Sequence, residues 1–158
     1  MKKIGFIDDR EVYYINVKDD VTWNAKLPFG NWCAFTVVDA DGRELIDEIV
    51  ARCLDSNVSY TCSSGELADE TELAFDIEIV RREIEKESKS GIPPDYEVVP
   101  LTTVHNDFSE GLWFATFVAT TGDDEIDKVV CIDVTNDGVL EQLKRLVDDI
   151  NNGWLPPD

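Results

Sequence analysis

Residues 32–62, WCAFTVVDADGRELIDEIVARCLDSNVSYTC, decide the fold of this chain. The opening run Trp32–Val38 is almost entirely apolar, which is typical of a strand buried on both faces of a sheet. Five apolar residues then recur at helical spacing within residues 42–55 and predict a helix there: Ile46, Ile49, Val50, Cys53 and Leu54. Val58–Cys62 is a second short strand, so the unit predicts two parallel strands joined by a right-handed crossover.

Further elements are expected on both sides of this unit. The short apolar runs Lys3–Ile7 and Val12–Val17, separated by four polar residues, predict an N-terminal hairpin. Three later runs predict strands, the first of them an edge strand because it contains Pro100: Glu97–Val104, Leu112–Ala119 and Lys128–Val134. The other two we expect in the interior of the sheet.

Two more helices follow from apolar periodicity. A stripe made of Leu73, Ile77, Val80 and Ile84 predicts the longest helix, with the stripe as its inward face and charged residues on the other. A last helix is predicted from six apolar positions, with Gly153 just beyond its end: Val139, Leu140, Leu143, Leu146, Val147 and Ile150.

The order of these elements predicts the fold class. We expect an α/β, Rossmann-like sandwich with a mixed β-sheet of about seven strands, three flanking helices and an N-terminal β-hairpin. A chain of 158 residues is of ordinary size for one domain, so residues 1–158 are predicted to form a single domain.

The charge of the chain restricts its partners. With 34 acidic and 14 basic residues the formal net charge is −20. Such a surface repels phosphate backbones and anionic lipid, so we expect no nucleic-acid and no membrane partner. A basic protein partner would be attracted over a long range. Charge of one sign also serves solubility alone, and this alternative stays open.

The chain shows no targeting segment and no zinc motif. The apolar run after Met1-Lys2-Lys3 is too short for a signal peptide, and no later run reaches the ~20 residues of a membrane span, so a cytoplasmic location is expected. The four cysteines lie in or beside apolar segments and are predicted to be reduced core thiols: Cys33, Cys53, Cys62 and Cys131. The only histidine is His105.

Four acidic residues follow predicted strands, where α/β folds place their sites. These are Asp39 and Asp41 after one strand and Asp133 and Asp137 after a later one. If they converge, they are suitable ligands for Mg²⁺, which favours a few carboxylates with waters and phosphate oxygens. Asp is also favoured in ordinary caps and turns at strand ends, so both interpretations remain.

The run Val37-Val38-Asp39-Ala40-Asp41-Gly42 resembles the first motif of the haloacid dehalogenase phosphatases, a strand followed by DxDG. That resemblance implies a phosphoryl-accepting nucleophile at Asp39 and a general acid at Asp41. It also implies a second motif at Thr61 or Ser63 and metal-binding residues at Asp133 and Asp137. The N-terminal run Ile4–Asp9 is similar to the first strand of response-regulator receiver domains, whose paired acids bind Mg²⁺.

A second arrangement suited to chemistry is a cysteine nucleophile. Cys62-Ser63-Ser64-Gly65 is predicted to connect a strand to a helix, where backbone N–H groups and the helix dipole lower a thiol pKa. His105 would be its base, oriented by Asn106 or Asp107. A lone Cys and a lone His meet this description by chance as well.

The sequence therefore favours a non-catalytic acidic binding module, such as an immunity or antitoxin protein that inhibits a basic protein, without catalytic residues, metal or cofactor. The alternative is a Mg²⁺-dependent aspartyl-phosphate enzyme or phosphoacceptor that uses Asp39, Asp41, Asp133 and Asp137. No GxGxxG or P-loop string supports nucleotide binding.

Overall fold

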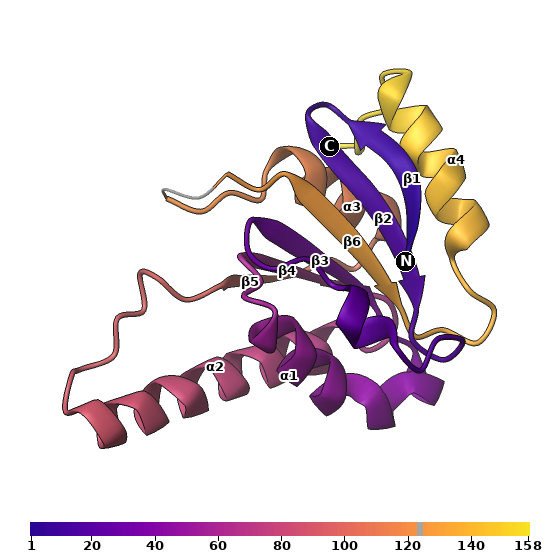
Figure 1. The fold of residues 1–158 in the computed structure, drawn as a ribbon. Helices are drawn as coiled ribbons and strands as arrows, with labels where there is room; N and C mark the ends of the chain where they lie inside the picture. Colours follow the sequence, from indigo (N-terminus) through magenta and orange to yellow (C-terminus); the bar gives the residue numbers. More distant parts are fainter. Residues whose placement is uncertain (123–124) are drawn as a thin grey trace.

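A mixed sheet runs through the middle of the molecule in the strand order β1-β2-β6-β3-β4-β5 (Figure 1). The computed structural model describes residues 1–122 and 125–158. Over these residues the strands are β1 (Lys2–Ile7), β2 (Arg10–Asn16), β3 (Trp32–Val37), β4 (Tyr60–Ser64), β5 (Leu101–Val104) and β6 (Lys128–Asp133). The helices are α1 (Ile46–Asp55), α2 (Ala68–Ser90), α3 (Phe108–Phe117) and α4 (Leu140–Asn151), with 3₁₀ turns η1 (Trp23–Lys26) and η2 (Ala40–Leu45).

The sheet is parallel except at one edge. β2, β6, β3, β4 and β5 run in the same direction, and β1 pairs antiparallel with β2. The turn between β1 and β2 contains Asp8 with φ of 53°, a left-handed conformation that Asp tolerates better than most residues. The predicted N-terminal hairpin is therefore present, and the carboxyl ends of the five parallel strands share one edge of the sheet.

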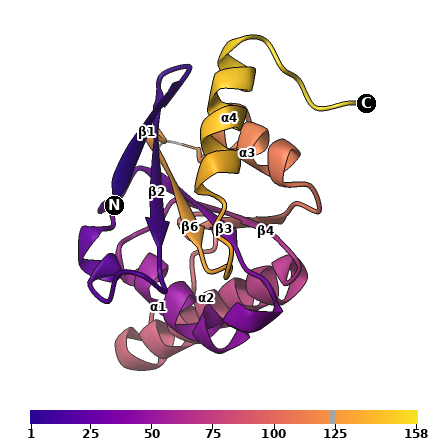
Figure 2. The ribbon, with the colours of Figure 1, turned by 90° about the vertical axis from the view of Figure 1, so that its right-hand side faces the viewer.

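Helices cover both faces of the sheet. α1 and α2 lie on one face and α3 and α4 on the other (Figure 2). Each face has its own apolar core, with Phe75 and Ile49 on the α1–α2 side and Leu112 and Leu143 on the α3–α4 side. This confirms the predicted α/β sandwich with a mixed sheet. The described residues form six strands and four α-helices rather than about seven strands and three helices.

The difference in number comes from residues 112–119, which we expected to form an interior strand and which instead lie mostly in α3. Polar residues secure both ends of this helix. Asp107 at its N-cap accepts a hydrogen bond from the Glu110 N–H (2.8 Å), and Arg10 donates to the Ala115 and Ala119 carbonyls (2.7 Å each). A short, wholly apolar run has no period that separates a strand from a buried helix, so the prediction was wrong.

The predicted inward face of α2 was also wrong. The helix buries Ala68, Thr71, Phe75, Ile79 and Glu83, which lie on the opposite side from the expected stripe. The stripe residues Leu73, Ile77, Val80 and Ile84 are 42–61% exposed. The helix thus has two apolar sides, and only one of them packs against the sheet.

β5 is an edge strand of four residues, as Pro100 just before it predicted. α2 is the longest helix in the described part of the chain, but its sequence is polar. None of the described helices combines the length and the apolar character that a membrane span requires.

Candidate functional site

The four carboxylates of the predicted Mg²⁺ site lie near the carboxyl edge of the parallel strands, in different surroundings. Asp133 ends β6 and is completely buried, whereas Asp41 and Asp137 are exposed. Asp39 follows β3 and is half-buried, and its Oδ1 has no hydrogen-bond partner in the described structure. Within residues 1–122 and 125–158, no group of three or more His, Cys, Asp or Glu could hold a metal ion. The Mg²⁺ site stays a prediction, and we propose no metal.

Asp133 has a structural role that accounts for both of its oxygens. Tyr14 donates its hydroxyl to Oδ2 (2.5 Å), and the Val139 N–H donates to the same oxygen (2.8 Å). Thr135 donates its N–H and its hydroxyl to Oδ1 (2.8 and 2.7 Å). Burial first, and then this hydrogen bond to Asp133, raise the pKa of Tyr14, which keeps its proton. The carboxylate thus shapes the loop that leads from β6 into α4.

The crevice where this fold class binds ligands is closed. The chain leaves β3 toward α1 on one face and leaves β6 toward α4 on the other, so the switch point lies between these neighbouring strands. A Cβ at Gly42 would lie only 2.8 Å from Val134 Cγ1, so the two loops are already in contact there. The Asn136 side-chain amide also donates to Asp41. Side chains of the chain itself occupy this position.

Cys62 and His105, predicted as an alternative nucleophile and base, do come together. Cys62 lies in the middle of β4 and not in the expected connection before α2, so the N-terminus of that helix does not act on it. Thr103 of β5 is its register partner, and the Thr103 hydroxyl lies 3.5 Å from Cys62 Sγ and 2.9 Å from His105 Nε2. His105 Nδ1 donates to Glu110 Oε2 at 2.7 Å.

The sequence did not single out Thr103 and Glu110. We expected Asn106 or Asp107 to orient the imidazole, but Asp107 caps α3 and Glu110, one turn into that helix, takes the orienting position. Gly111 allows the close approach of α3, because a Cβ there would lie 3.0 Å from the Cβ of His105. The spacing His-x₄-Glu would have been the only signal for Glu110, and it requires α3 to be known as a helix.

The electrostatics of this cluster favour a thiolate beside an imidazolium. Burial raises the pKa of the Cys62 thiol, but hydrogen bonds with Cys33, His105 and Thr103 outweigh it and lower the pKa to about 6. Cys33, whose Sγ lies 3.8 Å away, is fully buried, and burial and the bond to Cys62 hold its pKa well above the usual value. Burial lowers the pKa of His105, but the bonds with Cys62 and Glu110 raise it by more.

A substrate cannot reach the sulfur in this conformation. Cys62 has no exposed surface, the His105 side chain is 6% exposed, Thr103 is half-buried, and the Glu110 side chain is 39% exposed. A nucleophile must approach its substrate to about 3–3.5 Å. The cluster therefore has the composition of a Cys–His–Glu triad inside a closed core.

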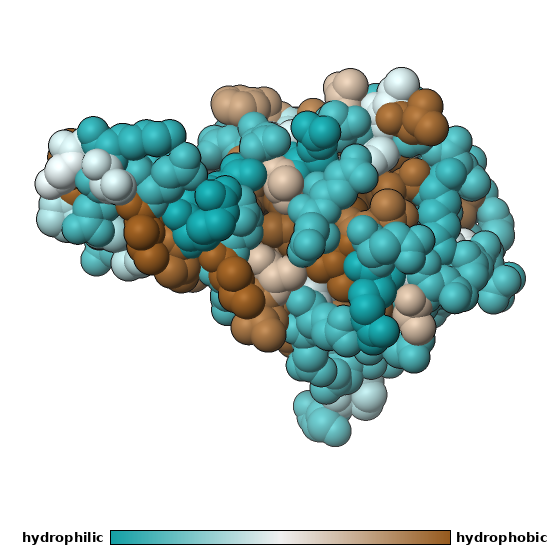
Figure 3. Space-filling view, turned by 90° about the horizontal axis from the view of Figure 1, so that it is seen from below, coloured by the Kyte–Doolittle hydropathy of each residue, from teal (hydrophilic) through white to brown (hydrophobic). Residues whose placement is uncertain are grey.

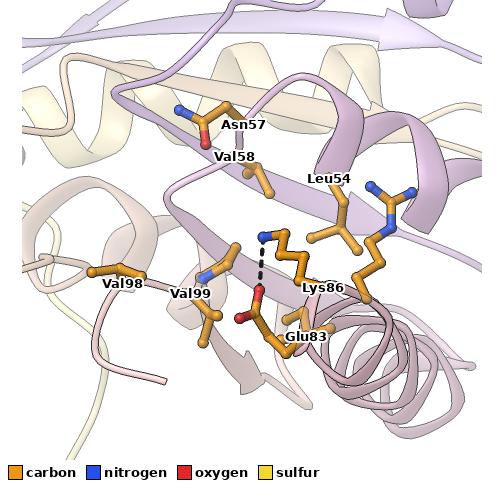
Figure 4. Close-up of a pocket in the computed structure, with 10 residues that line it drawn as sticks. Leu54, Asn57, Val58, Glu83, Lys86, Val98 and Val99 are labelled. Atoms are coloured by element: carbon orange, nitrogen blue, oxygen red, sulfur yellow. Dashed lines mark hydrogen bonds and ion pairs between the residues drawn. The ribbon is translucent and has the colours of Figure 1, made fainter. Parts of the chain in front are cut away.

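Three cavities lie near the amino ends of the parallel strands. One of about 170 Å³ lies between α1, α2 and residues 98–100, and Figure 4 shows the Lys86–Glu83 ion pair in its wall. Small-molecule sites typically measure ~300–1,000 Å³, so this cavity is small for a ligand. Two broader depressions, of about 420 and 450 Å³, are lined by segments before β2, β4, β5 and β6, at the amino ends of these strands.

The exposed stripe of α2 is the surface feature that these sites do not explain. Figure 3 shows a row of hydrophobic side chains along the arm that α2 forms, on the side away from the sheet. We call Leu73, Ile77, Val80 and Ile84 the α2 row; they are 56, 61, 42 and 55% exposed. Neighbouring apolar residues exposed together mark interaction surfaces more often than single ones do.

The two flanks of the α2 row differ in charge. At 3.6 residues per turn, Asp69, Glu72 and Asp76 lie along one side, which we call the acidic flank. It faces β5, because the Thr102 hydroxyl bonds with Asp76 (2.6 Å) and with Glu72 (3.1 Å). Burial first, and then the charge of Asp76, raise the pKa of Glu72, as expected for adjacent carboxylates without a cation between them.

Ion pairs neutralise the other flank. Arg43 pairs with Glu70 in two hydrogen bonds of 2.9 and 2.8 Å. Arg81 pairs with Glu78 (2.7 Å) and Glu85 (3.1 Å). Among the described residues, Asp69, Glu72 and Asp76 therefore form no ion pair on the β5 side of the row, whereas the charge on the other side is largely balanced.

Comparison with known proteins gives a family and no function. No curated protein and no solved structure matches the chain significantly. The family model described as "Domain of unknown function (DUF7684)" matches residues 12–150, from the third residue of β2 to the next-to-last residue of α4. The chain therefore belongs to the DUF7684 family.

Proposed function

We propose that this chain is a non-catalytic binding module that engages a basic protein, in the manner of an immunity or antitoxin protein that blocks a basic toxin. One observation carries the proposal: the exposed α2 row lies beside an uncompensated acidic flank. Apolar contact supplies affinity at such a surface, and charge selects a basic partner and speeds the encounter.

The distribution of charged residues along the sequence supports a binding surface at α2 and β5. The first 38 residues contain five acidic and five basic residues, so the excess lies entirely in the rest of the chain. Between Arg52 and Arg81 there are seven acidic residues and no basic one, and between Lys89 and Lys128 there are eight and none. These two stretches include the first half of α2 and all of β5, which meet at Thr102.

Solubility alone explains the charge but not the row. A surface selected only for solubility avoids adjacent exposed Leu, Ile and Val, because such residues promote association. Here four of them follow one another along a helix whose opposite side already provides its packing contacts.

Affinity capture from cells that produce the chain tests the proposal. The bait is the full chain, compared with an Asp69→Asn/Glu72→Gln/Asp76→Asn variant and with an Asp8→Asn/Asp9→Asn/Asp19→Asn control that removes as much charge elsewhere. We expect a basic protein retained at low salt by the wild type and the control, and lost from the α2 variant and at high salt. Capture of no basic protein, or equal capture by all three baits, would contradict the proposal.

Thiol chemistry at Cys62 is a second candidate. The grouping of Cys62 and His105 around Thr103 and the His105–Glu110 contact favour it, and the burial of Cys62 opposes it. Titration of the native protein with a disulfide reagent such as DTNB separates the two functions. If the module is non-catalytic, all four cysteines react only as the protein unfolds, because each is buried. One thiol reacting fast in the native state, with an apparent pKa near 6 that Cys62→Ser abolishes, would favour the enzyme instead.

A further inference from the structure

We infer that the basic partner presents an amphipathic α-helix, which lies along the α2 row with its basic residues against the acidic flank. This inference rests on the proposed function and adds the form of the partner and its orientation. The backbone N–H and C=O groups in the middle of α2 bond within the helix, so this surface cannot pair with a strand. It offers side chains at a helical period.

The spacing of the α2 row is that of a helix–helix seam. Leu73, Ile77, Val80 and Ile84 follow one another at intervals of four, three and four residues. This is the a/d spacing of a coiled coil, in which each apolar side chain inserts between four side chains of a facing helix. The row spans twelve residues, or eleven steps of about 1.5 Å and about 16 Å in all, which matches roughly three turns of a partner helix.

The flanks determine which edge of the partner is basic. Asp69 and Asp76 are seven residues apart and Glu72 lies between them, so the acidic flank follows the first half of the seam. Further along, Glu83 is buried and paired with Lys86. On the other side, Arg81 is already held by Glu78 and Glu85. Lys or Arg residues at one edge of the partner helix would therefore meet unpaired carboxylates, and at the other edge they would meet neutralised pairs.

A second copy of this chain is a poorer occupant. In an antiparallel pair of α2 helices the same sides face each other, which would bring the acidic flanks of both copies to the same side of the seam. A parallel pair would place the acidic flank against Arg81, which has two acidic partners already. Each copy also carries a net charge of −20, which opposes their association.

A designed peptide probes this surface directly. The probe is an 18-residue synthetic helix with Leu at intervals of four, three and four residues, Lys along one edge and Ala or Gln elsewhere. Its binding to the full chain is followed by fluorescence anisotropy at low and at physiological salt. Ile77→Ser/Val80→Ser removes the centre of the row, and Val21→Ser is the matched control because Val21 is 93% exposed in a loop. Circular dichroism confirms that each variant is folded.

We expect the double variant to bind the probe at least about tenfold more weakly than wild type, with the control unchanged. Moving the Lys residues to the opposite edge should weaken binding as well. Equal affinity for wild type and double variant, or no binding at low salt, would overturn the helical docking. The proposed function would survive either result if affinity capture still retains a basic protein through the acidic flank.

Sedimentation velocity tests whether a second copy of this chain covers the α2 row. We expect the wild-type chain to sediment as a monomer at micromolar concentration. A dimer that Ile77→Ser/Val80→Ser dissociates would overturn the inference, because the α2 row would then be covered by a second copy.

Discussion

His105 connects three elements through its ring. Its Nδ1 contacts Glu110 of α3 and its Nε2 contacts Thr103 of β5, whose hydroxyl also lies 3.5 Å from the Sγ of Cys62 in β4. Because the folded state holds the His105 proton more tightly than the unfolded chain, protonation stabilises the fold fully below the ordinary pKa of 6.5. That contribution is lost as the pH rises through the higher folded value.

The single histidine makes this cluster measurable. We expect NMR titration of the one imidazole signal to give a pKa above 6.5 in the wild-type chain. Glu110→Gln and Cys62→Ala should each lower it, because each removes a group that raises it, and the distant Asp8→Asn should leave it nearly unchanged. A wild-type value at or below 6.5, or no response to either substitution, would show that the ring is not paired as described.

At this scale the sequence identified two members of the cluster and missed the others. Cys62 and His105 were recognisable because their residue types are scarce and chemically distinctive. Thr103 and Glu110 were not, because their roles depend on strand register and on α3 being a helix. Asp133 was identified as a possible ligand, but its structural role depends on Tyr14, which is 119 residues away in the sequence.

At the scale of elements, the sequence of α2 does not determine which of its two apolar sides packs against the sheet. Its existence and its end at Gly91, which has φ of 72°, follow from periodicity and from a glycine in the left-handed conformation. Both sides of the helix carry apolar residues, however, and helical periodicity predicts the α2 row as the inward side. Phe75 and Ile79 fill the core instead, with the neighbouring Thr71 hydroxyl satisfied by the Leu67 carbonyl (2.8 Å).

Two substitutions in α2 distinguish its faces. Phe75→Ala should lower the free energy of unfolding by about 3–5 kcal/mol, because Phe75 is fully buried. Ile77→Ala, only two residues later, should change it by less than about 0.5 kcal/mol, because Ile77 is 61% exposed. Urea unfolding with an unchanged m-value measures both. A cost for Ile77→Ala equal to that of Phe75→Ala would mean that the row is packed.

At the scale of the whole molecule, the arrangement of elements was more predictable than their number. The strand–helix–strand unit at residues 32–62 requires parallel pairing, and the hairpin adds an antiparallel edge, so the mixed sheet follows from local patterns. Whether an apolar run such as residues 112–119 forms a strand or a helix depends on distant contacts, here the Arg10 guanidinium at the end of α3. No local pattern contains that information.

The net charge of −20 also acts on the molecule as a whole. Like charges on a folded surface repel one another more than in the expanded chain, so screening should stabilise the fold. We expect the midpoint of thermal unfolding to rise as NaCl increases from 10 to 300 mM, by roughly 2–4 °C for each ~1 kcal/mol of relieved repulsion. A midpoint that falls or stays constant would mean that the surface ion pairs offset the repulsion.

Site-specific photo-crosslinking in cells that produce the chain tests the central claim most directly. Benzoylphenylalanine is introduced at position 77, in the α2 row, and at position 21, a more exposed loop site, as the control. If the row is the docking surface, position 77 forms a covalent adduct with a basic protein, the adduct is lost with Asp69→Asn/Glu72→Gln/Asp76→Asn, and position 21 forms none. Adducts from position 21 alone, or only adducts between copies of this chain at position 77, would contradict the account.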